Sequence, residues 1–137
     1  MQNTNLYALF QQKFPQDLNK IFLKQEDGQS LTYGQMDQWS AKMAAFLKDQ
    51  RIVKGDRILV QVEKSMTAVV LYLACLRIGA VYLPLNTAYT VNEVNYFIEN
   101  ARPSLLIPDP APEGKFTPHK FPIFTLDSAC QETLREQ

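Results

Sequence analysis

The stretch LYLACLRIGAVYLPLN, residues 71–86, joins the end of a helix to a short strand. Its first half continues an apolar run that predicts a helix over residues 66–78. Gly79 follows at the position where a left-handed backbone costs glycine least. Residues 81–83, Val-Tyr-Leu, are typical of a strand, which Pro84 ends because proline donates no backbone hydrogen bond. A helix followed by a strand in this way is part of a βαβ unit.

Short strands and helices alternate on both sides of this stretch. Ser65 is a predicted N-cap, and Thr32 with Gln35 and Thr90 with Glu93 have the spacing of capping boxes. We expect strands over 58–60, 81–83 and 104–107, and helices over 35–49, 66–78 and from the second capping box to residue 101. The alternation predicts an α/β fold, with βαβ units forming a mostly parallel sheet flanked by helices.

The two ends of the chain have weaker patterns. Residues 5–14 form a modestly amphipathic segment that Pro15 ends, and an Asp-Gly turn within residues 21–33 predicts a hairpin. Residues 108–122 contain five prolines and predict a loop. Residues 123–126 have the composition of one more short strand, and the tail after them has that of the start of a helix.

Length and charge restrict the class of protein. The chain has 137 residues, enough for one domain, and its 14 basic and 14 acidic residues give a formal net charge of zero. We therefore expect no nucleic-acid partner, because duplex binding usually needs a basic surface. The longest apolar run, Met66 to Leu76, is too short to span a membrane, and the N-terminus lacks the pattern of a secretory signal. These features predict a soluble, cytoplasmic protein.

Several reactive side chains are better explained by structure than by chemistry. Cys75 lies in the apolar helix and predicts a buried reduced thiol, and neither it nor Cys130 has the spacing of a zinc site. His119, the only histidine, lies in the proline-rich loop and predicts exposed polar surface. Trp39 falls on the apolar stripe of its helix and predicts a core anchor.

Carboxylates and glycines give no site either. The pair Glu63-Lys64 predicts a solvated turn, and Asp109 and Glu113 have the spacing of neither a glycosidase pair nor a metal site. The five glycines are too scattered to form a loop that cradles phosphate; they are Gly28, Gly34, Gly55, Gly79 and Gly114.

The loop PLNTAYT, residues 84–90, is the most interesting polar segment. It leaves the carboxyl end of a predicted parallel strand, which is the edge where open α/β sheets bind their ligands. Asn86 and Thr87 are also ordinary turn formers, and Thr90 is already used as a helix cap. The residues alone therefore leave both a functional and a structural interpretation of this loop open.

Five motifs resemble one enzyme family. LTYGQM (31–36), KGDRI (54–58) and RIGAVYLPLN (77–86) are similar to the N-terminal part of the adenylate-forming acyl-CoA synthetases. VEKS (62–65) and NEVNYFI (92–98), with the helix between them, most resemble the malonyl-CoA synthetases within that family. The resemblance covers roughly residues 5–110. It implies that these residues build part of the large N-terminal domain of the synthetase fold.

The resemblance also implies a two-step reaction. ATP and a carboxylate form an acyl-adenylate with release of pyrophosphate, and the thiolate of coenzyme A then displaces AMP to give the thioester. Mg²⁺ would neutralise the phosphates. For malonate, one carboxylate would be activated while a cation, such as an arginine in a bidentate pair, holds the other.

Family members are several times longer than this chain, and their nucleotide-binding motifs, hinge and catalytic lysine follow the part present here. We therefore expect residues 1–137 to be a partial N-terminal AMP-binding domain without the C-terminal domain, inactive alone. No catalytic, cofactor-binding or metal-binding residue is assigned to any position. ATP, Mg²⁺ and coenzyme A would serve the full-length enzyme, with none bound to this chain.

The expected partners are the remainder of the same polypeptide, a small carboxylic acid for the full-length enzyme, and a second copy of the chain through exposed apolar surface. Two other interpretations remain open at this point. The chain could be a stand-alone, truncated and non-catalytic interaction module. It could also belong to a synthetase for another small or medium carboxylic acid.

Overall fold

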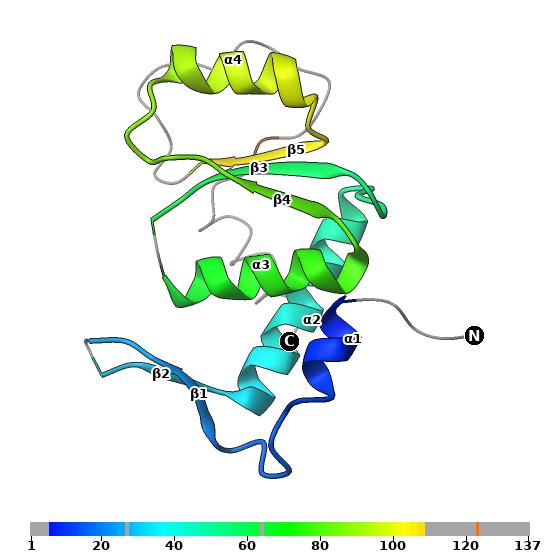
Figure 1. The fold of residues 1–137 in the computed structure, drawn as a ribbon, viewed down its shortest axis with the longest axis vertical. Helices are drawn as coiled ribbons and strands as arrows, with labels where there is room; N and C mark the ends of the chain where they lie inside the picture. The colour runs from blue at the N-terminus through cyan, green and yellow to red at the C-terminus, as the bar shows by residue number, and fades with distance from the viewer. Residues whose placement is uncertain (1–5, 27, 64, 109–122, 124–137) are drawn as a thin grey trace.

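The computed structural model describes residues 6–26, 28–63, 65–108 and 123. Its elements follow the alternation that the sequence predicts (Figure 1). They are α1 (Leu6–Gln11), β1 (Ile21–Lys24), β2 (Ser30–Thr32), α2 (Tyr33–Asp49), β3 (Arg57–Gln61), α3 (Met66–Ile78), β4 (Val81–Pro84), α4 (Val91–Ala101) and β5 (Leu105–Pro108).

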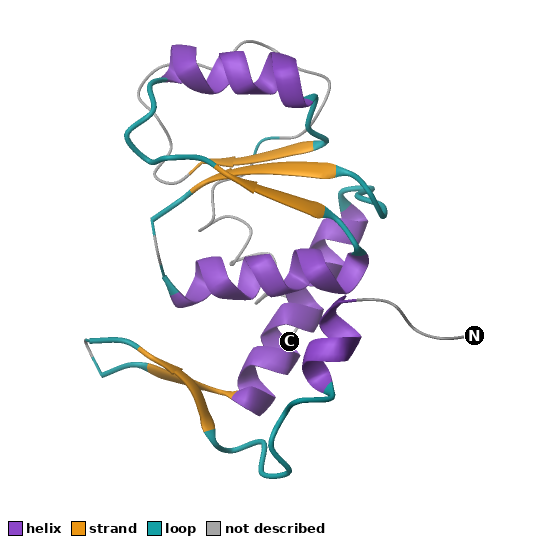
Figure 2. Ribbon diagram, in the orientation of Figure 1, coloured by secondary structure: helices purple, strands orange, loops and turns teal. Residues whose placement is uncertain are grey.

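A three-stranded parallel sheet is the centre of the fold. Its strand order is β4-β3-β5, with Ile58 opposite Tyr82 on one side and Leu105 on the other. Helix α3 covers one face of the sheet and α4 covers the other (Figure 2). Ile123 forms a parallel bridge with Leu106, on the side of β5 away from β3. The predicted α/β class is confirmed.

Alternate residues of the strands face the two sides of the sheet. Ile58 and Val60 of β3 pack into the larger core with α3 and α2, whereas Leu59 packs with α4. Because α3 lies between the sheet and α2, it is apolar nearly all round, and its residues Leu71 and Ala74 are fully buried. This confirms the burial expected from the sequence.

An aromatic cluster holds the N-terminal segment against the hairpin. Tyr7, Phe10, Phe14, Phe22 and Tyr33 contact one another edge to face, with ring centroids 5.1 to 6.4 Å apart. They come from α1, the segment that follows it, β1 and the start of α2. Within the amphipathic segment 5–14 the described helix is Leu6–Gln11, and the chain turns after Gln11 to bring Phe14 into this cluster.

The predicted helix starts are present. Thr32 and Gln35 form a capping box at α2, and Thr90 and Glu93 form another at α4. Ser65 accepts a hydrogen bond from the backbone N–H of Ala68 at the start of α3. The predicted loop over residues 108–122 begins instead with the last residue of β5, and the rest of that loop and the predicted tail helix lie outside the described residues.

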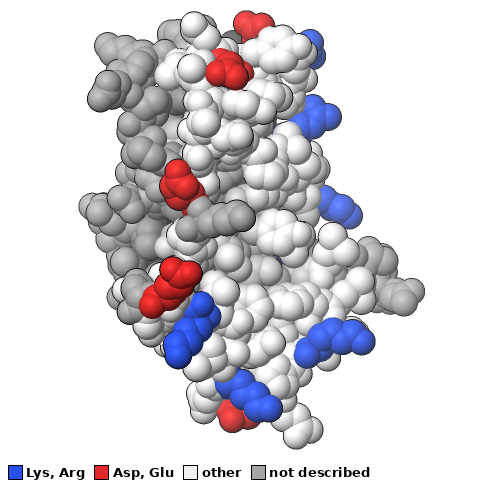
Figure 3. Space-filling model, turned by 60° about the vertical axis from the view of Figure 1, so that its left-hand side comes forward, with Lys and Arg blue, Asp and Glu red and all other residues white. Residues whose placement is uncertain are grey.

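The face in Figure 3 carries charged residues of both signs. On the face in Figure 3, lysine and arginine side chains lie apart and form no continuous basic patch among the described residues. In the part of the chain that the structure describes, no helix has the length and apolar character needed to cross a membrane. The absence of a nucleic-acid partner stays a prediction.

Candidate functional site

The carboxyl ends of β3, β4 and β5 meet at one edge of the sheet. Because α3 and α4 lie on opposite faces, the chain reverses its winding direction at β3, and open α/β sheets bind ligands outside such a point. The segments that leave this edge include residues 62–65 after β3 and residues 85–90 after β4, which we name the edge loop. The edge loop contains the polar segment that the sequence singles out.

Gln61, the last residue of β3, connects this strand to the edge loop. Its side chain is 8% exposed, and only Gln61 and Ser40 are buried polar residues among those described. The amide nitrogen Nε2 donates one hydrogen bond to the carbonyl oxygen of Asn86 (3.1 Å) and one to that of Tyr89 (3.0 Å). Both hydrogens of the amide group therefore bind the edge loop.

The edge loop is also ordered by its own residues. The Asn86 side-chain oxygen accepts a hydrogen bond from the backbone N–H of Ala88 (2.8 Å), and the N–H of Tyr89 donates to the Asn86 carbonyl (3.1 Å). Thr90 caps α4, and the side chain of Thr87 is exposed. Asn86 and Thr90 thus have the structural roles that the sequence suggested, whereas Thr87 lies on the accessible surface of the loop.

An aromatic surface adjoins the edge loop. The rings of Tyr89 and Phe97 stack with centroids 5.2 Å apart and planes 20° from parallel. Tyr96 contacts Phe97 edge to face and is 65% exposed. The loop and α4 therefore present flat apolar rings next to the carboxyl edge.

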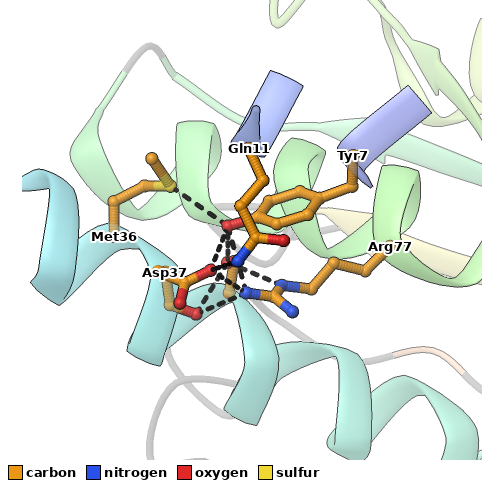
Figure 4. Close-up of polar contacts among 6 residues, drawn as sticks. Tyr7, Gln11, Met36, Asp37 and Arg77 are labelled. Carbon is orange, nitrogen blue, oxygen red and sulfur yellow. Dashed lines mark hydrogen bonds and ion pairs between the residues drawn. The ribbon is translucent and has the colours of Figure 1, made fainter. Parts of the chain in front are cut away.

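A second polar cluster joins α1, α2 and α3 (Figure 4). The Arg77 guanidinium forms an ion pair with Asp37 and donates to the Tyr7 hydroxyl (3.0 Å) and to the Ser40 hydroxyl (3.0 Å). It also lies 3.9 Å from the centre of the Tyr7 ring, in cation–π geometry. The Tyr7 hydroxyl in turn donates to Asp37 (2.6 Å), while the Gln11 amide donates to the same carboxylate (3.3 Å).

The electrostatics of this cluster favour a structural role. Burial raises the pKa of Tyr7, and its hydrogen bond to the Asp37 carboxylate raises it further, so the phenol stays protonated at neutral pH. The charges of Arg77 and Asp37 are satisfied by each other and by the surrounding hydroxyls. The cluster therefore holds α1, α2 and α3 together, and its charged groups are engaged in structural contacts.

The reactive residues named from the sequence do not gather into a site. Cys75 is fully buried, and burial raises the pKa of its thiol to about 12, as expected for an inert thiol. Glu63 is exposed, whereas Lys64 lies outside the described residues. The same is true of four other residues: Cys130, His119, Asp109 and Glu113.

Trp39 is partly buried against the core, with the Lys42 ammonium 5.6 Å from its ring centre. It also lines a pocket of about 160 Å³ between the hairpin, α2 and α3. The other lining residues are Leu31, Met43, Met66, Thr67 and Val70. Trp39 therefore packs against the core as expected, and part of its side chain lines the pocket.

Two of the motifs that carry the family resemblance, KGDRI and RIGAVYLPLN, contact each other at the opposite, amino edge of the sheet. The N–H of Gly55 in KGDRI donates to the carbonyl of Gly79 in RIGAVYLPLN (2.9 Å), and the N–H of Val81 donates to the Asp56 carbonyl (2.7 Å). Arg57 reaches across to donate to the carbonyl of Ala101 at the end of α4 (2.7 Å). These contacts between the two motifs are therefore structural, and they lie away from the carboxyl edge, which VEKS and the end of RIGAVYLPLN reach.

The profile of the family described as AMP-binding enzyme matches residues 10–133. The chain belongs to this family. ATP-bound MatB from Rhodopseudomonas palustris is 40% identical, with a TM-score of 0.75 over 80% of this chain and 22% of that one. An artificially fused NpsA-ThdA adenylation–PCP di-domain from Klebsiella oxytoca has a TM-score of 0.78 at 21% identity, over 96% of this chain and 24% of that one.

A plipastatin synthase polypeptide from Bacillus subtilis (strain 168) is 26% identical over 95% of this chain and 5% of its own length. The chain thus spans a quarter or less of these three relatives. The AMP-binding family consists of adenylate-forming ligases, and its structures share the fold seen here. ATP use follows for the family.

The absence of catalytic, cofactor-binding and metal-binding residues from this part of the chain stays a prediction. Among the described residues, no three His, Cys, Asp or Glu side chains come together to hold a metal ion. Gly28 and Gly55, two of the left-handed glycines, lie in the hairpin turn and at the amino edge, and neither belongs to a glycine-rich phosphate loop. No step of the reaction is therefore assigned to these residues.

Sequence reasoning missed both side-chain networks. The pairing of Tyr7 with Arg77 spans 70 positions, and no local pattern reveals it. Two signals were available: Arg77 interrupts an otherwise apolar helix, and Gln61 ends a strand that is buried on both faces. A polar group at such positions needs partners, because an unpaired buried donor is costly.

Proposed function

We propose that this chain is the N-terminal part of an ATP-dependent acyl-CoA synthetase that activates malonate. The identity of 40% with MatB is the observation that supports it most, since the NpsA structures are 21–22% identical. The motifs VEKS and NEVNYFI, which resemble malonyl-CoA synthetases, point to the same acid. The overall reaction would convert carboxylate, ATP and coenzyme A to acyl-CoA, AMP and pyrophosphate.

In this proposal residues 1–137 are a partial acyl-adenylating domain that supplies scaffold, and later parts of the polypeptide supply the catalytic groups. The chain alone is then inactive, and Mg²⁺ and coenzyme A belong to the complete enzyme. The remainder of the polypeptide is the main partner and covers apolar surface. Without it, we expect self-association through exposed side chains such as Leu6, Ile21 and Val53.

The proposed location is the cytoplasm. The buried free thiol of Cys75 is typical of proteins kept in a reducing compartment.

A second candidate is adenylation of a different carboxylic acid. The match to the plipastatin synthase supports this alternative, because it extends over 95% of the chain. The two candidates share the fold and the first half-reaction and differ in the acid.

The experiment is to isolate the native polypeptide from its source cells with an antibody against residues 28–63. Its mass is measured, and so is acid-dependent pyrophosphate release with malonate, acetate and a mixture of amino acids, each with and without coenzyme A. The proposal expects a mass several times 15.7 kDa and release with malonate. Release with an amino acid and not with malonate, at a rate that coenzyme A does not change, would support the second candidate. A native mass near 15.7 kDa without release would contradict both.

A further inference from the structure

We propose that Gln61 is a positioning residue for the carboxyl edge of the sheet. Its amide group holds the edge loop in one closed conformation, and the adenylating enzyme needs this conformation for acid-dependent pyrophosphate release. The structural half of this inference stands on the geometry of the loop. The catalytic half rests on the proposed function.

The Gln61 side chain supplies hydrogen bonds at the point where the backbone pairing of β3 with β4 stops. The register of β3 with β4 ends with Val60 opposite Pro84, and the N–H of Leu85 adds one more bond to the Val60 carbonyl (2.8 Å). Beyond Leu85, the Gln61 side chain donates the hydrogen bonds that join the loop to β3. The Gln61 side chain thus connects β3 to the segment after β4, beyond the last backbone hydrogen bond.

Apart from the Leu85 N–H and the apolar packing of Leu85 and Tyr89 against Leu59 and its neighbours, the other contacts of the edge loop stay within the loop and α4. The Asn86 side chain closes a turn within the loop, the Tyr89 ring stacks on Phe97 of α4, and Thr90 caps α4. These contacts would move together with the loop and α4. Loss of the Gln61 amide therefore removes the hydrogen bonds that join Asn86 and Tyr89 to β3, and the loop's own hydrogen bonds at Ala88 and Tyr89 are then no longer held in one conformation.

The site requires two hydrogen-bond donors. Nε2 faces two carbonyl oxygens, so a methionine of similar volume supplies no bond. A glutamate supplies one bond when protonated and repels both oxygens when ionised. The variant Gln61→Glu should consequently make the position of the loop depend on pH, which wild-type Gln61 does not.

The first test measures the loop in the 137-residue protein. Amide hydrogen exchange is followed at Ala88 and Tyr89, whose N–H groups are hydrogen-bonded within the loop, in wild type, Gln61→Met and Gln61→Glu. We expect exchange about tenfold faster in both variants at pH 7, since each lost bond shifts the opening equilibrium several-fold. Gln38→Glu, the same charge change at an exposed position of α2, is the matched control and should leave it unchanged.

The second readout is the pH dependence of the amide chemical shifts of Ala88 and Tyr89. In Gln61→Glu they should move with a single titration and return toward wild-type values at low pH. Wild type and Gln38→Glu, which have the same Glu93 carboxylate bonded to the Thr90 N–H, give the baseline from which this additional titration is measured. Unchanged exchange in both Gln61 variants, in proteins that keep the protection of α3, would overturn the inference. A titration absent from Gln61→Glu would overturn it as well.

The catalytic half is tested in the complete enzyme. With malonate, Gln61→Met should lower the kcat of pyrophosphate release about tenfold, and Gln61→Glu should lose activity as the pH rises through its titration. Gln38→Glu should match wild type. A wild-type enzyme without activity toward any acid refutes the proposed function and leaves the loop measurements valid. An active wild type with a fully active Gln61→Met refutes the positioning role.

Discussion

Replacing Gly79 with alanine tests the contact between KGDRI and RIGAVYLPLN at the amino edge of the sheet. Gly79 has φ of +75°, so an L-residue there adopts the left-handed conformation, which costs about 1–2 kcal/mol. A Cβ atom would also lie 2.9 Å from Cγ of Lys54 and force that side chain to move. An off-rotamer lysine adds about 1 kcal/mol. We therefore expect Gly79→Ala to lower the free energy of unfolding by about 2–3 kcal/mol.

Two matched variants separate the backbone cost from the contact. Gly55 has φ of +90° and open space around its Cβ position, so Gly55→Ala should cost only the backbone part, about 1–2 kcal/mol. Removing Lys54 beyond Cβ, with Lys54→Ala, should relieve the contact and return Gly79→Ala to that smaller value. Free energies come from urea unfolding followed by the fluorescence of Trp39. Equal losses for Gly79→Ala and Gly55→Ala, with no effect of Lys54→Ala, would refute the reasoning.

Three further predictions concern single side chains. The pKa of Tyr7 is raised in the folded state, so its contribution to stability is complete below its ordinary value of 10.0 and is lost as the pH rises above it. Unfolding measured from pH 8 to 11 should show a smaller decline in Tyr7→Phe than in wild type. Arg102 has φ of +50° at the end of α4, so Arg102→Gly should raise the free energy of unfolding by about 0.5–1 kcal/mol in urea titrations, and a loss would contradict this. In a Cys130→Ser background, the buried Cys75 thiol should react with a thiol reagent only at the rate of unfolding. Rapid labelling of the native protein would contradict its burial.

The fold was predictable because its signals are local. Helix caps at Thr32, Ser65 and Thr90 are read from residues three positions apart, and the apolar run before Gly79 marks a buried helix directly. The caps act within one helical turn, and the apolar run acts within one helix. These signals therefore predict the helices without reference to the tertiary contacts of the rest of the chain.

The side-chain networks were not predictable, because they depend on how the elements pack. Gln61 reaches the edge loop 25 and 28 positions later, and nothing in the strand sequence specifies those carbonyls. The choice of acid is further from prediction still, since no contact with an acid is assigned to any residue of these motifs. Malonate, the domain boundary and the assignment of no catalytic residue therefore stay proposals.

The contact of Tyr7 with Arg77 also has a consequence for synthesis on the ribosome. The two residues are 70 positions apart, and ribosomes add about 5–20 residues per second. For roughly 4–14 seconds of translation, the aromatic side chains near the N-terminus exist without the arginine that fastens them. A nascent chain in this interval exposes apolar rings, so the binding of a chaperone to the first helix would be expected to end as α3 emerges.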